Sequence, residues 1–367
     1  MLRRSLLLAG AVLLATNGLA AAQSSAPVPS GYPADYASLI EQSKSDPEIV
    51  VYSNLQLANW EKVSEGFKAK YPWTTLTVVD LGSEVFERYY AESATNGRTA
   101  DLILAGGADN WADFVAKAGA IDYGSPELAG LPDDAQTSPG IYTVSADPAV
   151  MVYNKHVLSE AEVPKSLKAL ADLIGTRPDL KSRIVTQTTA VPFGRTAAWA
   201  WVQHNPDAWD TLAKIGPSTR VERAVGSILE KITTGEYALG FFVNGSALLT
   251  KMTDPAFVEL IGWSFIEDGT PIVPRRIAIP NNAKNQSGAK LLLDYLLSHE
   301  GQVALGMTGV TAYRTDVKQD EVAGYPYGAI VEQVGADNIA FEHDDAAYVA
   351  GREAFLEKMK SIFGQDK

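Results

Sequence analysis

The chain has 367 residues, of which 46% are hydrophobic and 20% are charged, and its net charge at pH 7 is −13. This composition is typical of a globular protein, and the length predicts two domains. A strongly acidic chain is a poor nucleic-acid binder, so we expect no nucleic-acid partner. Cysteine is absent, which excludes disulfides and anchoring through a lipidated cysteine.

The first 22 residues have the pattern of a secretory signal peptide. Arg3-Arg4 precedes the apolar run Ser5–Leu14, and the small residues Ala20–Ala22 follow. This order of charged, apolar and small residues predicts export and cleavage near Ala22. The arginine pair leaves both Sec and twin-arginine export open. We therefore expect a mature periplasmic protein in which residues 23–34 form a linker.

Three units of strand, polar or glycine tip, and helix are predicted in the first part of the mature chain. Ile49–Tyr52, Leu76–Leu81 and Asp101–Leu104 are short β-branched or apolar runs that suit buried strands. In an open α/β sheet, ligands bind beyond the carboxyl ends of the strands. The residues that follow these strands are therefore candidate ligand contacts, namely Ser53, Asn54, Ser83 and Gly106.

The second part of the chain contains two more such tips. The predicted strand Arg183–Gln187 is followed by Thr188 and Thr189, and the predicted strand Tyr237–Val243 is followed by Asn244 and Ser246. Each of these polar residues alone is readily explained as a helix N-cap. Their joint placement at strand ends favours a shared, anion-friendly surface made with helix N-termini.

Two breaks between strands indicate that the chain crosses twice between lobes. Ile141–Ser145 and Ala149–Tyr153 are strand-like on either side of Ala146–Pro148, and a second break lies at Glu267–Pro271. We predict crossings near Ala146 and Asp268. The predicted division is lobe 1 at residues 35–145 and 271–312, and lobe 2 at residues 146–270 and 313–367.

Several motifs resemble a known family. Glu300–Gln302 (Glu-Gly-Gln) after an apolar helix, Tyr313–Val317 with its arginine and aspartate, and Val152–Asn154 resemble motifs of extracellular solute-binding proteins. These are the capture subunits of ABC importers, in the branch that includes ferric-iron and phosphosugar binders. The resemblance implies an α/β, two-lobed type II periplasmic binding fold. Each lobe would hold a mixed sheet flanked by helices, with a ligand cleft between the lobes and an inner-membrane permease as partner.

The iron-binding members of that branch can be compared with this chain residue by residue. Where they carry an adjacent tyrosine pair, this chain has Gly245 and Ser246, and its first strand tip, Ser53–Gln56, lacks their histidine. Ferric iron prefers hard anionic oxygen ligands, so we expect no metal site. The phosphate-binding members show a Ser-Gly-Thr-like element where this chain has Thr188–Thr196, which is a partial match.

Arg195 is the strongest single candidate for binding an anion. It stands just before a predicted helix, where a cation gains nothing from the helix dipole, and a guanidinium binds carboxylate or phosphate through two hydrogen bonds. A surface salt bridge is the plain alternative. Arg275 and Arg276 open a predicted strand, so one of them points inward. We take Arg275 as the candidate, although the sequence does not decide between them.

The chain has no nucleophile elbow, Walker loop or metal motif, so we expect neither catalysis nor a cofactor. The predicted function is periplasmic solute capture by a monomer for an ABC importer. The expected ligand is a small organic anion, either a carboxylate or a phosphate ester with hydroxyls. Ferric-iron capture, a secreted enzyme on the same scaffold and a ligand-loaded adaptor for a membrane sensor are the alternatives.

Overall fold

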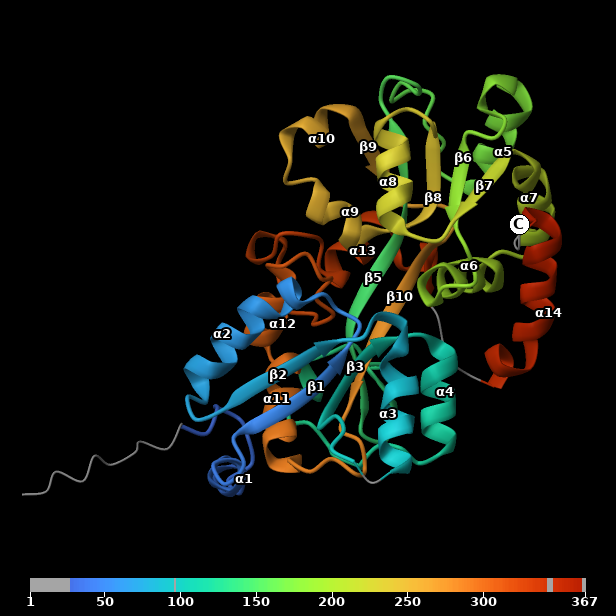
Figure 1. Cartoon of the computed structure of the whole chain (residues 1–367). Helices are drawn as coiled ribbons and strands as arrows, with labels where there is room; N and C mark the ends of the chain where they lie inside the picture. The colour runs from blue at the N-terminus through green and yellow to red at the C-terminus, as the bar shows by residue number, and fades with distance from the viewer. Residues whose placement is uncertain (1–26, 96, 342–345, 365–367) are drawn as a thin grey trace, which may run out of the picture.

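The computed structural model describes residues 27–95, 97–341 and 346–364, and the predicted signal peptide lies outside them. The chain forms two α/β lobes, one above the other in Figure 1, with β5 (Ile141–Asn154) and β10 (Thr270–Ala278) at their junction. This two-lobed arrangement of mixed sheets and flanking helices confirms the predicted fold.

Lobe 1, the lower lobe of Figure 1, is built on a sheet with the strand order β2-β1-β3-β10-β5. The first three strands are parallel, and β10 is antiparallel to both β3 and β5. Its other strands are β1 (Glu48–Ser53), β2 (Thr75–Asp80), β3 (Leu102–Gly106), β4 (Gln136–Ser138) and β11 (Ile339–Phe341). The associated helices are α1 (Tyr36–Ser43), α2 (Glu61–Lys70), α3 (Val85–Ala94), α4 (Ala108–Ala116), α11 (Gln286–Leu297), α12 (His299–Gly306) and α13 (Tyr327–Val334).

Lobe 2, the upper lobe, has the strand order β9-β5-β8-β6-β7. Strand β6 pairs in parallel with β7 and β8, whereas β5 is antiparallel to β8 and β9. Its other strands are β6 (Ile184–Gln187), β7 (Thr219–Glu222), β8 (Leu239–Asn244) and β9 (Ile261–Ser264). The helices are α5 (Leu167–Thr176), α6 (Pro192–His204), α7 (Ala208–Ile215), α8 (Val225–Thr233), α9 (Gly245–Lys251), α10 (Pro255–Leu260) and α14 (Ala346–Phe363).

Strand β5 runs unbroken through both sheets, where the sequence predicts two strands with a break at Ala146–Pro148. All 14 of its residues are buried, and its first part pairs with β10 while its last part pairs with β8 and β9. The contacts of Asp147 explain why the strand can continue through a charged residue. Its buried carboxylate accepts a hydrogen bond from the Thr311 amide (3.3 Å) and binds Arg275, so the charge inside the strand is compensated.

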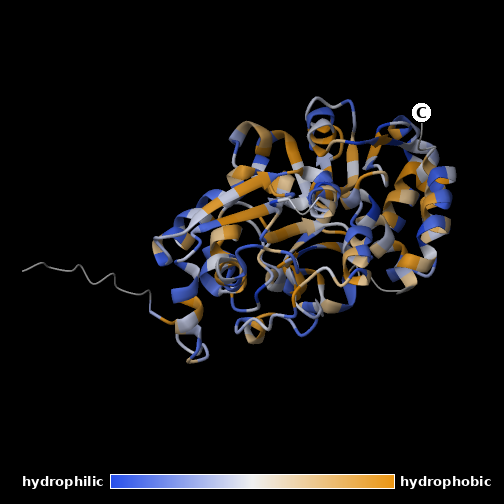
Figure 2. Cartoon of the chain, turned by 60° about the horizontal axis from the view of Figure 1, so that its bottom comes forward, coloured by the Kyte–Doolittle hydropathy of each residue, from blue (hydrophilic) through white to orange (hydrophobic). Residues whose placement is uncertain are grey.

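The hydrophobic residues that form the core of each lobe lie on the strands and on the inner sides of the helices, as Figure 2 shows. In lobe 2 the last helix belongs to this core. Trp199 of α6 packs edge-on against Tyr348 and Phe355 of α14, with ring centroids 5.1 and 5.2 Å apart. Helix α14 therefore covers lobe 2.

Among the described residues between α12 and α14, Tyr313 and Arg314 instead contact lobe 1. The Tyr313 hydroxyl donates to Asp134 (2.8 Å), and the Arg314 guanidinium binds Glu127 (2.6 Å). The lobe boundaries given above stay predictions, but these contacts favour assigning residues 313–341 to lobe 1 and residues 346–364 to lobe 2.

The Glu-Gly-Gln motif has a structural role that explains its last residue. Gln302 is fully buried, and its amide nitrogen donates to the carbonyls of Val144 (2.9 Å) and Leu296 (2.8 Å). Its amide oxygen accepts from the backbone of Tyr313 (2.6 Å) and Arg314 (3.3 Å). The motif therefore ties β5, α11 and the arginine loop together, and each polar atom of the buried side chain is satisfied.

Candidate functional site

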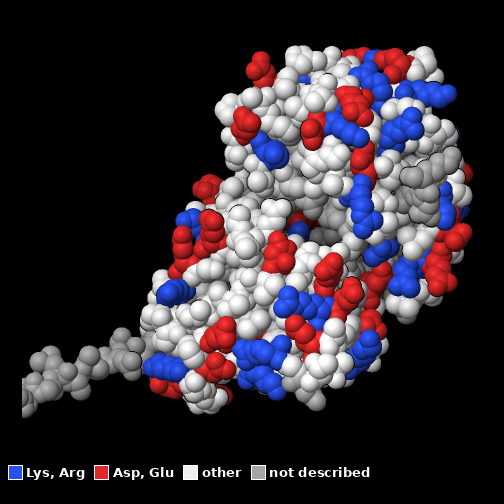
Figure 3. Space-filling model, viewed as in Figure 1, with Lys and Arg blue, Asp and Glu red and all other residues white. Residues whose placement is uncertain are grey.

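A cleft with a volume of about 590 Å³ lies between the lobes, and Figure 3 shows the molecule hollowed there. The polar residues on its lobe 1 side are Asn54, Gln56, Asn59, Arg275 and Thr308. Those on the lobe 2 side are Asn244, Ser246, Thr250 and Lys251. Among the described residues that line the cleft, two are cationic and none is acidic. The cleft lining is therefore polar and carries two cations, of which Arg275 is paired with the buried Asp147.

Arg275 is the inward member of the arginine pair that the sequence left open. It lines the cleft, whereas Arg276 is 1% exposed and is not among the lining residues. The Arg275 guanidinium contacts the fully buried Asp147 carboxylate and the Ser145 hydroxyl (3.4 Å). Its Nε atom is buried and has no hydrogen-bond partner among the described residues. Asp147 thus holds the guanidinium in place and leaves its Nε donor unused.

Asn54 lies at the corner of the cleft next to Arg275, and Gly106 lies beside both without being among the lining residues. The Asn54 side-chain oxygen is buried without a hydrogen-bond partner in the described part of the chain. A Cβ atom added at Gly106 would lie 3.6 Å from the Asn54 amide nitrogen and 3.8 Å from Arg275 Cγ. The absence of a side chain at Gly106 therefore keeps this corner open.

Asn244 and Ser246 lie opposite, at the end of β8. The Asn244 side chain caps helix α9, since its oxygen accepts from the Ala247 amide (2.8 Å), so the N-cap explanation applies to this residue. The Ser246 hydroxyl is buried and has no partner within the described residues. Both residues line the cleft, and Ser246 is the one with unused hydrogen-bonding capacity.

Ser53, Ser83 and Gly106, which are three of the predicted contacts of lobe 1, are not part of the cleft lining. Ser53 is fully buried, and its hydroxyl accepts hydrogen bonds from the Leu55 amide (3.0 Å) and the Trp60 indole (3.2 Å). Ser83 is exposed on the short 3-10 helix Gly82–Glu84. Ser53 therefore has a structural role in the turn after β1.

Thr188, Thr189 and Arg195 lie together on another part of the interface between the lobes. The Thr188 hydroxyl accepts from the Ala190 amide (3.1 Å), and the Arg195 guanidinium donates to the Thr189 carbonyl (3.1 Å). Arg195 also binds Asp109 of helix α4, with 2.8 Å between Nη2 and Oδ2. None of the three residues is part of the cleft lining described above.

Sequence reasoning missed several cleft residues. Lys251 lies in the last turn of α9, and Thr308 lies in the loop after α12. Gln56 and Asn59 follow the first strand tip and could have been found by extending that tip a few residues into the next helix. Thr308 has no such signal, because only the tertiary fold brings its loop beside Asn59, whose amide donates to the Thr308 carbonyl (3.0 Å).

Residues 53–303 match the family described as bacterial extracellular solute-binding protein. The chain belongs to this family. Membership implies a small-molecule ligand, an ABC permease as partner and a periplasmic or secreted location. The described residues contain no helix long and apolar enough to span a membrane, and no cluster of three or more His, Asp or Glu side chains able to hold a metal ion.

Solved structures of similar fold include other binding proteins. The substrate-binding protein of an ABC transporter from Agrobacterium tumefaciens has a TM-score of 0.74 at 20% identity, covering 86% of this solute-binding protein and 94% of that chain. Apo ferric ion-binding protein A from Pasteurella haemolytica has a TM-score of 0.70 at 16% identity, covering 87% and 99%. AfuA from Actinobacillus pleuropneumoniae, solved with fructose-6-phosphate, has a TM-score of 0.63 at 18% identity, with the same coverage. Comparison with curated proteins finds no match.

Proposed function

We propose that this protein captures a small organic anion in the periplasm and delivers it to an ABC permease, without catalysing a reaction. The observation that carries the proposal is the charge of the cleft. Lys251 and Arg275 are its charged residues, and no acidic side chain lines it in the described part of the chain, although the sequence has 44 acidic and 31 basic residues. A cleft lined by one sign of charge attracts a ligand of the opposite sign.

The neutral residues of the cleft favour an anion that also carries hydroxyl groups. Asn54 offers a buried amide oxygen, Ser246 a buried hydroxyl and Arg275 a buried N–H group, all without partners among the described residues. Unpaired buried polar atoms are costly, and a ligand with hydroxyls and a carboxylate or phosphate ester would satisfy all three once these side chains rotate toward the cleft. A few fixed polar groups of this kind are typical of small-molecule sites.

The proposed ligand contacts are therefore Asn54, Asn244, Ser246, Lys251 and Arg275, with Gly106 providing space. Ser53, Ser83, Thr188, Thr189 and Arg195 stay predictions as ligand contacts. Ferric iron is disfavoured, because the described cleft lining has amide and hydroxyl groups and two cations in place of the anionic oxygen ligands that iron prefers. We also infer that the protein acts as a monomer.

The test is to identify the natural ligand and then remove one cleft charge. Protein purified from the periplasm without added ligand is denatured, and the released molecules are identified by mass spectrometry. Calorimetry then measures binding of that molecule, with citrate and fructose-6-phosphate as anionic probes. We expect Lys251→Met to weaken binding by about tenfold, because it removes one of the two cleft cations.

The matched control is Lys68→Met on helix α2, an exposed lysine outside the cleft, which should bind like the parent. Release of a neutral molecule, together with unchanged affinity in Lys251→Met, would contradict the proposal. A stoichiometric ferric complex with a visible charge-transfer band would instead support iron capture.

A further inference from the structure

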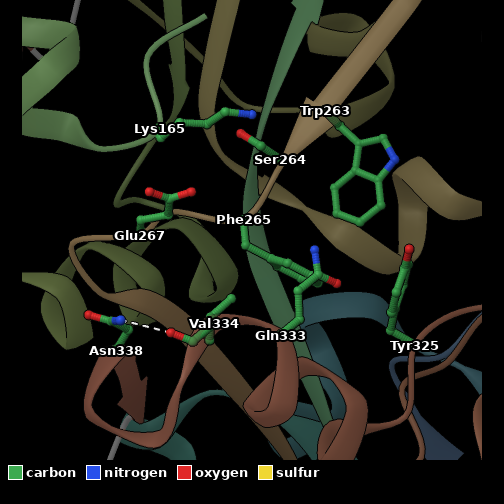
Figure 4. Close-up of a pocket in the computed structure, with 9 residues that line it drawn as sticks. All are labelled: Lys165, Trp263, Ser264, Phe265, Glu267, Tyr325, Gln333, Val334 and Asn338. Carbon is green, nitrogen blue, oxygen red and sulfur yellow. Dashed lines mark hydrogen bonds between the residues drawn. The ribbon is translucent and has the colours of Figure 1, made fainter.

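A second cavity, with a volume of about 650 Å³, lies at the junction of the lobes and shares no lining residue with the cleft. We call it the hinge cavity and define it by Lys165, Trp263, Ser264, Phe265, Glu267 and Tyr325 (Figure 4). Strand β9 and the connection from β9 to β10 supply four of these residues. Tyr325 comes from the segment before α13, so the cavity is bounded by both lobes.

One side of the hinge cavity is aromatic. The rings of Trp263, Phe265 and Tyr325 meet edge to face, with centroid separations of 5.2, 5.5 and 5.7 Å. Phe265 is 4% exposed, so it forms the base of this group, while Trp263 and Tyr325 flank the cavity in Figure 4. Such a group of rings presents rigid apolar surface to another ring or to a large aliphatic side chain.

The opposite side of the hinge cavity is polar and carries both signs of charge. Figure 4 shows Lys165, Ser264 and Glu267 on this side, with the Lys165 amine directed toward the Ser264 hydroxyl. The Glu267 amide donates to the Lys165 carbonyl (2.8 Å), which holds the two charged residues beside each other. Within the described residues, neither charged group has an ion-pair or hydrogen-bond partner, and the Ser264 hydroxyl is buried without one.

We propose that the hinge cavity is a second binding site, for a zwitterionic amino acid with an aromatic or large apolar side chain. Lys165 would bind the α-carboxylate, Glu267 the α-ammonium group, and the aromatic side the side chain. The lining charges of this cavity balance, which suits a ligand with no net charge, whereas the cleft is lined by cations only. Its volume lies within the range of small-molecule sites.

The occupant would contact both lobes, because Phe265 and Glu267 belong to the connection between them and Tyr325 belongs to the segment that packs on lobe 1. The site is independent of the ligand proposed for the cleft. It can therefore be tested on the mature full-length protein without knowing that ligand.

The test is calorimetry with L-phenylalanine and L-tyrosine as probes. We expect one site, at least tenfold weaker binding in Lys165→Met, Glu267→Gln and Trp263→Leu, and similar weakening for phenylacetate and phenethylamine, which each lack one charge of the zwitterion. The charged residues are exposed, so their variants should melt like the parent. Lys68→Met is the matched control and should bind the amino acids unchanged.

Three results would overturn the proposal. The first is the absence of binding by either amino acid up to about 10 mM. The second is equal affinity in the parent, Lys165→Met and Glu267→Gln. The third is loss of amino-acid binding in Lys251→Met with binding retained in the three hinge-cavity variants, because the amino acid would then occupy the cleft.

Discussion

The Asp109 carboxylate of lobe 1 binds the Arg195 guanidinium of lobe 2, with 2.8 Å between Oδ2 and Nη2. The other oxygen of the same carboxylate lies 2.9 Å from Nη1 of Arg352 in α14. The side chains of Asp109 and Arg195 are 19% and 15% exposed. The arginine that the sequence singled out for an anionic ligand is therefore paired with an anion of the protein itself, across the interface between the lobes.

This ion pair should contribute measurably to stability. Because both side chains are largely shielded from water, we expect a double-mutant cycle of Asp109→Asn and Arg195→Met to give a coupling energy of about 0.5–3 kcal/mol in urea unfolding. The double-mutant cycle of Asp109→Asn and Arg352→Met serves as the control. Its coupling energy should be smaller, since Arg352 is 38% exposed and exposed pairs contribute little. A coupling near zero for Asp109 and Arg195 would show that their contact is incidental.

Filling the space beside Gly106 should block the cleft. The Gly106→Leu variant places a branched side chain next to Asn54 and Arg275, and it should abolish binding of the ligand released from the native protein. Gly106 is not among the glycines with positive φ, so its backbone accepts other residues. Gly106→Ala is the matched control, because its Cβ would lie at ordinary contact distances of 3.6 and 3.8 Å. Calorimetry on both variants tests this, and full affinity in Gly106→Leu would place the ligand elsewhere.

Gln302→Leu should destabilise the fold strongly. It would leave the carbonyls of Val144 and Leu296 and the amides of Tyr313 and Arg314 without their present partner, and buried unsatisfied groups cost about 1–3 kcal/mol each. We expect a loss of about 2–5 kcal/mol in urea unfolding. The exposed Gln42→Leu on α1 is the control and should change stability little. A small effect of Gln302→Leu would mean that water replaces the side chain.

The sequence predicts the strands that carry the candidate tips, and the family, because each depends on local pattern, but it does not predict that β5 runs unbroken through both sheets. It does not predict which tip residue faces the ligand. Ser53 and Asn54 are neighbours with similar chemistry, yet Ser53 is buried against Trp60 and Asn54 lines the cleft. The side-chain direction is set by how the turn packs, and the loop of Thr308 reaches the cleft only through the tertiary fold. Likewise, the pairing of Arg195 with Asp109 joins residues of different lobes, which no local pattern encodes.

Asp294 of helix α11 is a buried carboxylate far in sequence from its three hydrogen-bond donors. The hydroxyls of Tyr36 (2.8 Å), Tyr123 (2.6 Å) and Ser125 (2.6 Å) all donate to it. Burial nevertheless dominates and raises the pKa of Asp294 from its usual 3.8 to about 6, against the opposing effect of these hydrogen bonds. The Asp294 carboxyl group therefore titrates near pH 6.

Asp294 should make the protein less stable as the pH rises from about 4 to about 6. In this window the folded protein holds a proton that the unfolded chain has released, so the free energy of unfolding falls with pH. A shift of this size corresponds to a loss on the order of 2–3 kcal/mol, complete above the folded pKa. Asp294→Asn keeps an oxygen acceptor for the hydroxyls but has no proton to lose. Urea unfolding at pH 4, 5, 6 and 7 gives the free energy of unfolding of the parent and of the variant. The stability of Asp294→Asn relative to the parent should increase as the pH rises through this window. Asp122→Asn removes an exposed carboxylate and should leave the difference flat. If the parent and Asp294→Asn run parallel from pH 4 to pH 7, Asp294 does not set the pH dependence.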